Sequence, residues 1–246
     1  YRQALDLREP VASRIAERMN DLALALRERY RDTENSQDLD EAVDLAKQAA
    51  AASTTDELTH AGHVNNLATA LSERYERDGD PADLVAAIER FSEALETAGN
   101  RPVEASGYAT NLGLALATHA QDTGSIGDMG RALLHLRRSI DILPTSHQAR
   151  ALRISNLSDV YRQRSVMLME GGNRVLALDD ARRAVKTGRE AVEAAGASDA
   201  RLLPALSNLA LSLRWRERLA PDVSPSREVL EIQRRAALLE EVTPVE

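Results

Sequence analysis

One sequence pattern recurs along the chain at a nearly fixed interval. Five segments share a leucine-centred motif, as in NNLATALSERY at residues 65–75 and TNLGLALATHA at residues 110–120. The anchoring leucines follow one another at spacings of 45, 45, 45 and 52 residues, and they are Leu22, Leu67, Leu112, Leu157 and Leu209. A period of this length indicates an array of similar units, each of which buries its apolar face on its neighbours.

Small residues recur in the same register. A small or apolar residue follows each anchor by 20 residues, and a second small residue comes seven residues later. The first set is Ala42, Ala87, Ala132, Ala177 and Val229, and the second is Ala49, Ala94, Ser139, Ala184 and Ala236. Only 3% of the chain is aromatic, so we predict helices that pack closely on small side chains. The register also reaches back to Ala4, so residues 1–9 are predicted to be the tail of a preceding repeat.

Each repeat divides into two amphipathic helices, which we call helix A and helix B. In the second repeat, helix A has apolar residues at Leu67 and Leu71, and helix B has them at Leu84 and Ile88. No segment alternates with a period of two, so we expect no sheet. We predict an all-α chain forming a single domain, whose repeats span approximately residues 10–53, 54–99, 100–144, 145–197 and 198–246.

Cap residues and prolines predict where the helices begin. An acid or hydroxyl residue at Asp80 and Ser125 is placed to cap a B helix, and Pro81 fits the first helical position. Capping boxes predict the starts of two A helices, and a Ser-Pro pair predicts the start of the last B helix. These three signals are Thr54–Glu57, Thr145–Gln148 and Ser224-Pro225.

Glycines and one irregular spacing predict where the helices end. Gly99, Gly124 and Gly196 lie at predicted helix ends, where glycine adopts a backbone conformation that other residues avoid. The last spacing exceeds the others by seven residues, which is close to two helical turns. We predict that the fourth B helix is longer and extends through Val192. The alternative is a longer loop around residues 195–200.

Charge and composition exclude several classes of protein. The chain has 31 Lys+Arg against 39 Asp+Glu, a net charge of −8, which argues against a general binder of nucleic acid or of anionic membranes. There is no cysteine, so disulfides, thiolate metal sites and cysteine nucleophiles are excluded. The longest stretch without Asp, Glu, Lys or Arg, Ala105–Gln121, is too polar to span a membrane. The chain does not begin with Met, and we expect a fragment or a processed chain.

The sequence offers little catalytic or metal chemistry. His60 and His63 have the spacing that could place two imidazoles on one metal ion, but no third ligand of the required kind is clustered with them. His119, His135 and His147 are scattered over different helices. No phosphate-binding loop and no G-x-S-x-G elbow is found. We predict no catalytic, cofactor-binding or metal-binding residue, and hence not an enzyme.

The repeats resemble the tetratricopeptide repeat (TPR). Asn66-Leu67-Ala68 and Asn111-Leu112-Gly113 match the N-L-G of its first helix, and Ala87 and Ala94 match the small residues of its second. The period of about 45 exceeds the usual 34 and resembles the long arrays of high-GC bacteria, which accompany CHAT or NB-ARC-type domains. The resemblance implies a right-handed α-solenoid whose A helices line the concave groove.

The same resemblance implies which residues face that groove. From the first to the last repeat they change from polar to arginine-rich, which favours a partner segment whose acidic part lies at the arginine end. Trp215 is interpreted either as an anchor for the partner or as a residue packed between the last two helices. The predicted partner-binding residues are Asn20, Arg27, Asn65, Thr69, Thr110, Leu114, Asp159, Arg162, Arg214 and Trp215.

These observations predict a cytoplasmic protein–protein interaction module. It would be a sensor or docking scaffold that binds a protein or peptide segment, or an adjoining domain of the same polypeptide. Self-association through an uncapped end is the leading alternative, and the regulatory domain of an enzyme is another. The basic run from Arg214 to Arg218 does not change this view. RNA-reading repeats need the same reader residues in every repeat, and here those positions vary, so we expect no nucleic acid.

Overall fold

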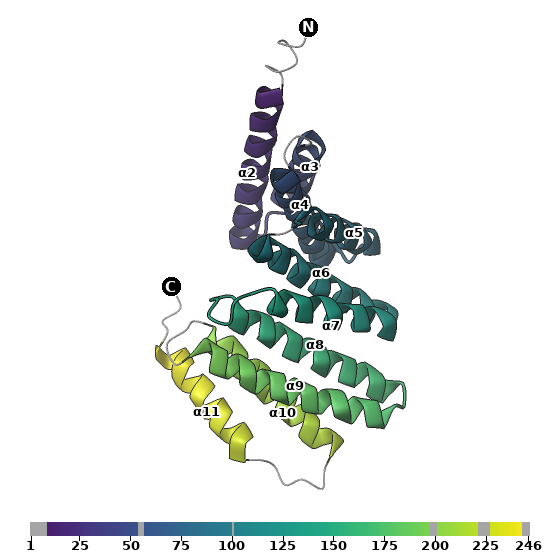
Figure 1. The fold of residues 1–246 in the computed structure, drawn as a ribbon, viewed down its shortest axis with the longest axis vertical. Coiled ribbons are helices and arrows are strands. Elements are labelled where there is room, and N and C mark those ends of the chain that lie inside the picture. Colours follow the sequence, from purple (N-terminus) through teal and green to yellow (C-terminus); the bar gives the residue numbers. More distant parts are fainter. Residues whose placement is uncertain (1–8, 54–56, 100, 197–200, 221–226, 243–246) are drawn as a thin grey trace. The chain divides into compact units, whose positions relative to one another are not determined.

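The computed structural model describes residues 9–53, 57–99, 101–196, 201–220 and 227–242, which form ten α-helices and no strand (Figure 1). The helices are α2 (Glu9–Thr33), α3 (Ser36–Ala52), α4 (Glu57–Asp78), α5 (Pro81–Thr97), α6 (Pro102–Thr123), α7 (Ile126–Asp141), α8 (Arg150–Glu170), α9 (Arg174–Ala195), α10 (Leu202–Leu219) and α11 (Arg227–Val242). They form five successive pairs, each of one A helix and one B helix, as the repeat pattern predicts. The predicted all-α fold class is therefore confirmed.

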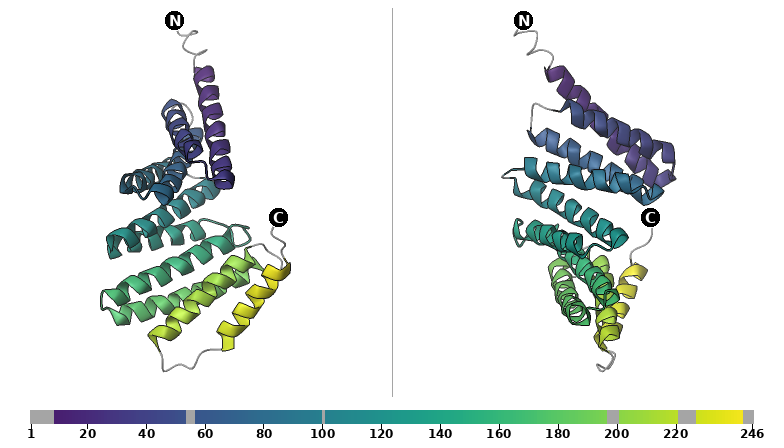
Figure 2. Two further views of the ribbon diagram at one scale, coloured as in Figure 1. Left: turned by 180° about the vertical axis from the view of Figure 1, so that it is seen from behind. Right: turned by 90° about the vertical axis from the view of Figure 1, so that its right-hand side faces the viewer.

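The chain divides into two compact units within α6, between Ala115 and Leu116. In the first unit, α2 packs on α3 and α4 packs on α5, while α4 also contacts α3 and α2 (Figure 1). In the second unit, α9 packs on both α8 and α10, and α10 packs on α11 (Figure 2). Within each unit, neighbouring A helices pack on each other, whereas among the described residues the backbones of neighbouring B helices, α3 and α5 or α9 and α11, do not approach each other closely.

The recurring small residues of the first four B helices are completely buried. Ala42, Ala87, Ala132 and Ala177 have no exposed surface, and neither do the four residues that follow them by seven positions: Ala49, Ala94, Ser139 and Ala184. A larger side chain at such a position would push two helices apart and leave voids beside it. The close packing on small residues that the sequence predicts is confirmed.

Two of the predicted helix starts are confirmed. The Asp80 carboxylate accepts a hydrogen bond from the Ala82 N–H at 3.0 Å at the start of α5, with Pro81 in the first turn. The Ser125 hydroxyl accepts one from the Asp128 N–H at 3.1 Å at the start of α7. The predicted signals at Thr54–Glu57 and Ser224-Pro225 lie outside the described residues.

The capping box predicted at Thr145–Gln148 is wrong, because α8 begins only at Arg150. The preceding residues form turns, in which the His147 N–H donates to the Pro144 carbonyl and the Arg150 N–H donates to the His147 carbonyl. The imidazole Nδ1 of His147 accepts the Ala149 N–H at 3.2 Å. A side chain that bonds its own backbone two residues further on stabilises a turn in place of a helix start.

The predicted helix ends are also confirmed. Gly99, Gly124 and Gly196 all have positive φ, between 56° and 71°, where glycine avoids the strain that a Cβ would cause. Helix α9 has 22 residues, against 16 or 17 in α3, α5 and α7, so the fourth B helix is longer, as predicted. Residues 197–200, which the alternative of a longer loop involves, lie outside the described part of the chain.

An ion pair with a buried aspartate closes the base of the hairpins, and the sequence analysis did not anticipate it. Near the end of helix A, Arg29 binds Asp38 with two hydrogen bonds of 2.5 and 2.7 Å, and Arg74 binds Asp83 with two of 2.7 Å. Both aspartates lie in the first turn of helix B, where the helix dipole favours negative charge. The equivalent positions of the third repeat hold His119 and Asp128, 3.2 Å apart. These pairs fix the end of one helix to the start of the next.

The fourth repeat makes a similar pair with a different register. Arg164 of α8 binds Asp180 of α9 with hydrogen bonds of 2.6 and 2.8 Å, and the Asp180 carboxylate is nearly buried. Arg164 continues the 45-residue series of Arg29, Arg74 and His119, but its acid has moved seven residues along the chain. The fourth repeat thus keeps the arginine position of the series and takes its acid from further into the B helix.

Two helical glycines give opposite predictions for substitution by alanine. A Cβ at Gly188 would lie 3.1 Å from Leu209 Cδ1 and 3.3 Å from its Cα, whereas nothing lies within 4 Å of a Cβ at Gly130. Gly130→Ala should therefore stabilise the protein by about 0.5–1 kcal/mol through helix propensity. Gly188→Ala should destabilise it by about 1–3 kcal/mol, because the Leu209 backbone cannot yield freely. Thermal and urea unfolding measure both, and a stabilised Gly188→Ala protein would contradict the packing.

The Arg74–Asp83 pair is tested by a double-mutant cycle. Asp83→Asn should lower the free energy of unfolding by about 1–3 kcal/mol, because it leaves a largely buried guanidinium with a weaker partner. The Arg74→Met/Asp83→Asn protein should lose less than the sum of the single losses. Asp44→Asn, at an exposed position of α3, is the control and should have little effect. A coupling energy below about 0.5 kcal/mol would mean that the pair does not hold the hairpin together.

Candidate protein-interaction surface

The A helices of the first unit are joined by asparagine side chains. The Asn66 amide donates to the Asn20 side-chain oxygen at 2.8 Å, and the Asn111 amide donates to that of Asn65 at 2.9 Å. Each bond joins residues that are 46 positions apart, so one repeat bonds to the next in the same way. We call this series of bonds the asparagine ladder. Two of the predicted site residues belong to it: Asn20, which is buried, and Asn65, which is half-buried.

A second link between α2 and α4 is electrostatic. Arg27 binds both carboxylate oxygens of Glu73, at 2.7 and 2.8 Å, and Arg31 binds the same carboxylate. Burial opposes the ionisation of Glu73, but the two guanidinium groups outweigh it and lower the pKa of the carboxyl. Arg27, which the sequence analysis assigned to the groove, is only 6% exposed and is bound within the fold.

The remaining predicted site residues of the first unit differ in exposure. The Thr69 hydroxyl donates to the Asn65 carbonyl at 2.8 Å, and the Thr110 hydroxyl donates to that of Ser106 at 2.9 Å, so both bond within their own helices. Leu114 is 38% exposed, which is unusual for a leucine of a central helix. Among the predicted site residues of this unit, Leu114 is therefore the one exposed apolar side chain.

In the second unit, α8 and α10 are linked in the same manner. The Asn208 amide donates to the Ser155 hydroxyl at 2.9 Å, which continues the ladder across the longer repeat. The predicted residues Asp159 and Arg162 bind each other on α8, and Asp159 also accepts from the Gln163 amide at 2.7 Å. Asp159 therefore already neutralises part of the charge of Arg162.

Exposed leucines and arginines gather on the same two helices. Leu152 of α8 is 44% exposed and Leu211 of α10 is 47% exposed. Arg214 and Arg218 follow Leu211 by three and seven residues, so the three side chains share one face of α10. Both arginines are exposed. We call Leu152, Leu211, Arg214 and Arg218 the leucine–arginine surface.

Trp215 belongs to the packing between α10 and the preceding hairpin. Its Nε1–H donates to the Ser165 hydroxyl at 2.8 Å, and that hydroxyl donates to the Ala177 carbonyl at 2.6 Å. The ring packs on a cluster that contains Leu168 and Leu219. The indole is half-buried and faces α8 and α9. Both bonds cross between helices, so the spacing within one repeat gives no signal for them.

The histidines of the predicted metal motif are engaged within the first unit. The His60 ring lies 3.4 Å from the Ser53 hydroxyl and 3.2 Å from the Glu93 carboxylate. Burial lowers the pKa of His63. Among the residues that the structure describes, no three His, Cys, Asp or Glu side chains are grouped so as to hold a metal ion. In the same residues, no helix is long and apolar enough to cross a bilayer.

Comparisons with known proteins agree with this class of fold, a helical repeat protein. Residues 15–51 match the family model of the tetratricopeptide repeat. TPR-like repeats of a kinesin-light-chain protein from Podosopora anserina superpose with a TM-score of 0.59 at 17% identity, over 96% of this chain and 99% of that one. A singly substituted form of those repeats gives 0.59 at 18% identity, over 94% and 98%. No curated protein sequence matches significantly.

The comparisons therefore show one tetratricopeptide repeat and a TPR-like fold. The repeat lies at residues 15–51, and the described helices of the chain have the TPR-like repeat fold. Repeats of this kind are protein-interaction scaffolds, in which adjacent helix pairs present a surface to a partner. The predicted resemblance to the tetratricopeptide repeat is confirmed by the family match at residues 15–51 and by the fold of the similar structures.

The pKa of Glu73 predicts how stability depends on pH. The folded-state pKa lies below the ordinary value of 4.5, so the ion pairs stabilise the protein above that value. This contribution is lost as the pH falls through the folded-state pKa. In Glu73→Gln the acid side of the stability curve should be shallower. Urea unfolding between pH 7 and 3 measures it, with exposed Glu41→Gln as the control, and equal slopes in all three proteins would contradict the assignment.

Proposed function

We propose that the chain is a docking scaffold whose A helices hold a segment of a partner protein, and that the leucine–arginine surface of the second unit supplies most of the affinity. The observation that carries this proposal is the exposure of Leu211 and Arg214 on one face of α10. The fitting segment presents apolar side chains and carboxylates together.

Physical chemistry favours this partner. An exposed leucine loses contact with water when a partner covers it, which contributes about 1.5–3 kcal/mol for full burial. A guanidinium binds a carboxylate through two parallel hydrogen bonds, which fixes the orientation of the segment. Arg162 is bound to Asp159, so we assign the larger electrostatic role to Arg214.

The predicted residues of the first unit have a supporting role in this proposal. An amide side chain can donate and accept hydrogen bonds at the same time, so a half-exposed Asn65 can bind a peptide backbone while it remains in the ladder. Thr69 and Leu114 offer a hydroxyl and an apolar contact beside it. The buried Asn20, Arg27 and Thr110 would position the helices that carry these groups.

A second candidate function, self-association, rests on an apolar hollow of about 440 Å³ in the first unit. It is lined by Ile15 and Met19 of α2 and by Gln48, Ala51 and Ala52 of α3. Ile15 and the nearby Leu22 are both about half exposed. A repeat face of this kind is able to pack on another copy. Whether the chain works beside a CHAT or NB-ARC-type domain stays a prediction.

The docking proposal is tested with a fluorescent 16-residue amphipathic peptide of leucine and glutamate. The native chain should bind it, and a leucine–glutamine peptide should bind more weakly. Arg214→Glu should weaken the binding by at least tenfold, or about 1.4 kcal/mol, whereas Arg182→Glu on the exposed side of α9 should leave it nearly unchanged.

Two outcomes separate docking from self-association. Equal affinity of the native chain and Arg214→Glu in fluorescence anisotropy would overturn the docking proposal. Light scattering after size-exclusion chromatography measures the oligomeric state of the same proteins. Ile15→Asp should abolish any oligomer that uses the hollow at Ile15 and Met19, and it should leave peptide binding intact.

A further inference from the structure

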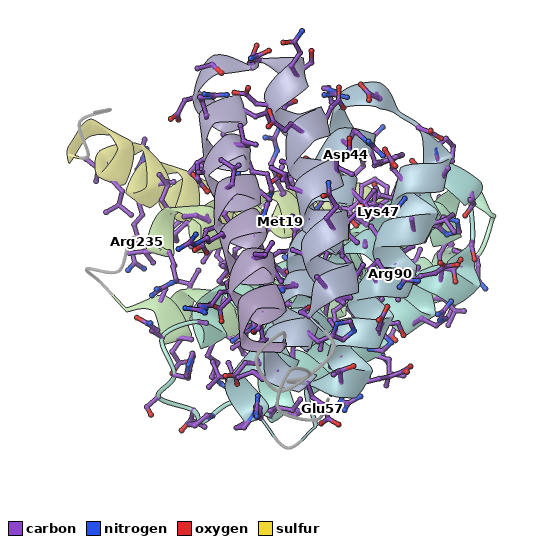
Figure 3. All side chains as sticks on the ribbon, turned by 90° about the horizontal axis from the view of Figure 1, so that it is seen from above. Met19, Asp44, Lys47, Glu57, Arg90 and Arg235 are labelled. Atoms are coloured by element: carbon purple, nitrogen blue, oxygen red, sulfur yellow. The ribbon has the colours of Figure 1, made fainter. Side chains whose placement is uncertain are left out.

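The first unit contains a groove between two B helices. It has a volume of about 630 Å³, with α3 and α5 as its walls and α4 as its floor, and we call it the α3–α5 groove. Val64, Leu67 and Leu71 of α4 form the floor. Seen from above, Asp44 and Lys47 of α3 and Arg90 of α5 all lie at this gap (Figure 3). The groove exists because the backbones of α3 and α5 stay apart along their described residues.

The shape of the groove suits an α-helix. Helices α3 and α5 each have 17 residues, which corresponds to a length of about 25 Å, or between four and five helical turns. Small residues line both walls, with Ala50 and Ala51 on α3 and Ala82 and Ala86 on α5. Alanine walls over an aliphatic floor allow an added helix to approach closely and bury its apolar face.

The two helices that form the walls are acidic overall, and the residues that line the groove include four acids, Asp44, Asp83, Glu89 and Glu93, and three bases, Lys47, Arg74 and Arg90. Helix α3 has four acids and one lysine, and helix α5 has four acids and one arginine. Two of these acids, Asp38 and Asp83, are held by Arg29 and Arg74. The single arginine of α5 is itself bound by Glu93. Asp44, Glu89 and Glu96 are exposed, so the walls present negative charge to solvent.

The surrounding unit has the same sign of charge. Residues 1–115 contain 12 Lys+Arg against 22 Asp+Glu, whereas residues 116–246 contain 19 against 17. The net negative charge of the chain therefore belongs to the first unit. The electrostatic field of a negatively charged unit attracts basic partners and speeds their association.

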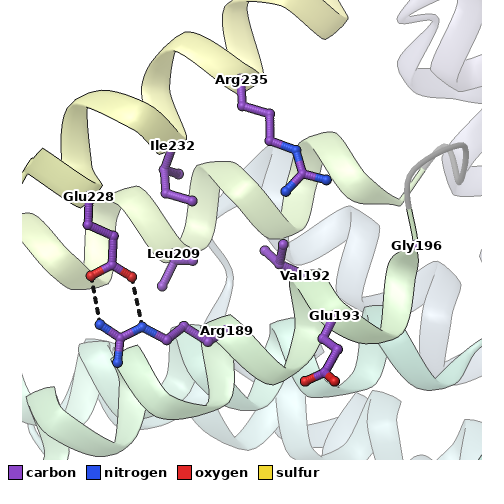
Figure 4. A pocket seen from close by; sticks show the side chains of 8 residues that line it. All are labelled: Arg189, Val192, Glu193, Gly196, Leu209, Glu228, Ile232 and Arg235. Carbon is purple, nitrogen blue, oxygen red and sulfur yellow. Dashed lines mark hydrogen bonds and ion pairs between the residues drawn. The ribbon is translucent and has the colours of Figure 1, made fainter.

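A comparable groove of the second unit has a different charge. It lies between α9 and α11 over Leu209 of α10 and has a volume of about 360 Å³ (Figure 4). Arg189 binds Glu228 across it with two hydrogen bonds of 2.7 Å, and Arg235 points into it (Figure 4). Helix α9 has five basic and four acidic residues, and α11 has three and four. The acidic walls are thus a property of the α3–α5 groove and not of every groove between B helices.

We infer that the α3–α5 groove is a second docking site, which binds an amphipathic helix of a partner protein with a leucine-rich face and lysine or arginine flanks. The apolar face would pack on Ala51 of one wall and on Ala82 and Ala86 of the other, above the largely buried Leu67 and Leu71, and the basic flanks would pair with Asp44 and Glu89. This site lies on the B helices and selects basic segments. The proposed A-helix surface selects acidic ones, so one scaffold could hold two partners of opposite charge.

The probe is a fluorescent 18-residue amphipathic helix of leucine and lysine, with a leucine–glutamate helix as its counterpart. The native chain should bind the lysine peptide, and the affinity should fall as salt rises because part of it is electrostatic. Asp44→Lys/Glu89→Lys should weaken the binding at least tenfold. Glu190→Lys/Glu193→Lys on α9 makes the same change of net charge elsewhere and should weaken it less than twofold.

A second pair of variants tests the groove itself. Ala86→Trp fills the groove from α5, and Ala51→Trp narrows it from an exposed position on α3 that tolerates a large side chain. Each should weaken binding of the lysine peptide at least fivefold, with the helical circular dichroism of the native chain. Arg214→Glu should leave this binding unchanged, which separates it from the A-helix surface.

Two results would overturn the inference. If Glu190→Lys/Glu193→Lys weakens binding of the lysine peptide as much as Asp44→Lys/Glu89→Lys does, the peptide is attracted only by the net charge of the chain. If a folded Ala86→Trp or Ala51→Trp protein binds as tightly as the native chain, the peptide does not lie in the groove.

Discussion

The fold depends on two small residues in each of the first four B helices that have no surface left to expose. At Ala42, Ala87 and their counterparts the side chain is completely covered by its neighbours, so a larger residue has no room without a shift of the surrounding helices. Gly188 lies on the longest B helix, and there even the Cβ of an alanine would be too close to Leu209. Once these contacts are fixed, the larger leucines have definite places to pack, and the polar groups of neighbouring helices come within hydrogen-bonding distance.

The two faces of the helix pairs use polar groups in different ways. On the A helices, asparagines and the Arg27–Glu73 pair bond one repeat to the next, so much of that surface is committed to holding the array together. The leucine–arginine surface of the second unit is the exposed part of the A helices that remains available to a partner. Along the described residues of α3 and α5, the backbones of these neighbouring B helices do not approach each other, and a groove lies between them above the largely buried Leu67 and Leu71. The A helices thus bond to each other, whereas these two B helices leave space for another chain.

Local features were predictable from the sequence, and contacts between repeats were not. Asp80, Ser125 and Gly124 act within a few residues of themselves, so their patterns sufficed to place helix ends. The residue types of Thr145–Gln148 match a capping box, but the preceding Pro144 and the hydrogen bond made by the His147 ring stabilise a turn instead. The partners of Arg27 and Trp215 lie 46 and 50 residues away, and only the packing of helices brings them together. The Arg74–Asp83 pair could have been found, because both residues recur at the 45-residue interval.

The step of the asparagine ladder governs how the length of such a chain can change in evolution. Excising 45 residues between equivalent points of α4 and α6 would bring Asn111 to the place of Asn66, opposite Asn20. Each residue that follows would then keep its position within the repeat pattern. An excision one residue longer or shorter would turn the following helix by about 100° and direct its leucines toward water. Whole repeats are therefore the natural unit of gain and loss. The fourth repeat, with its 53-residue step from Ser155 to Asn208, is the one that cannot be exchanged for another.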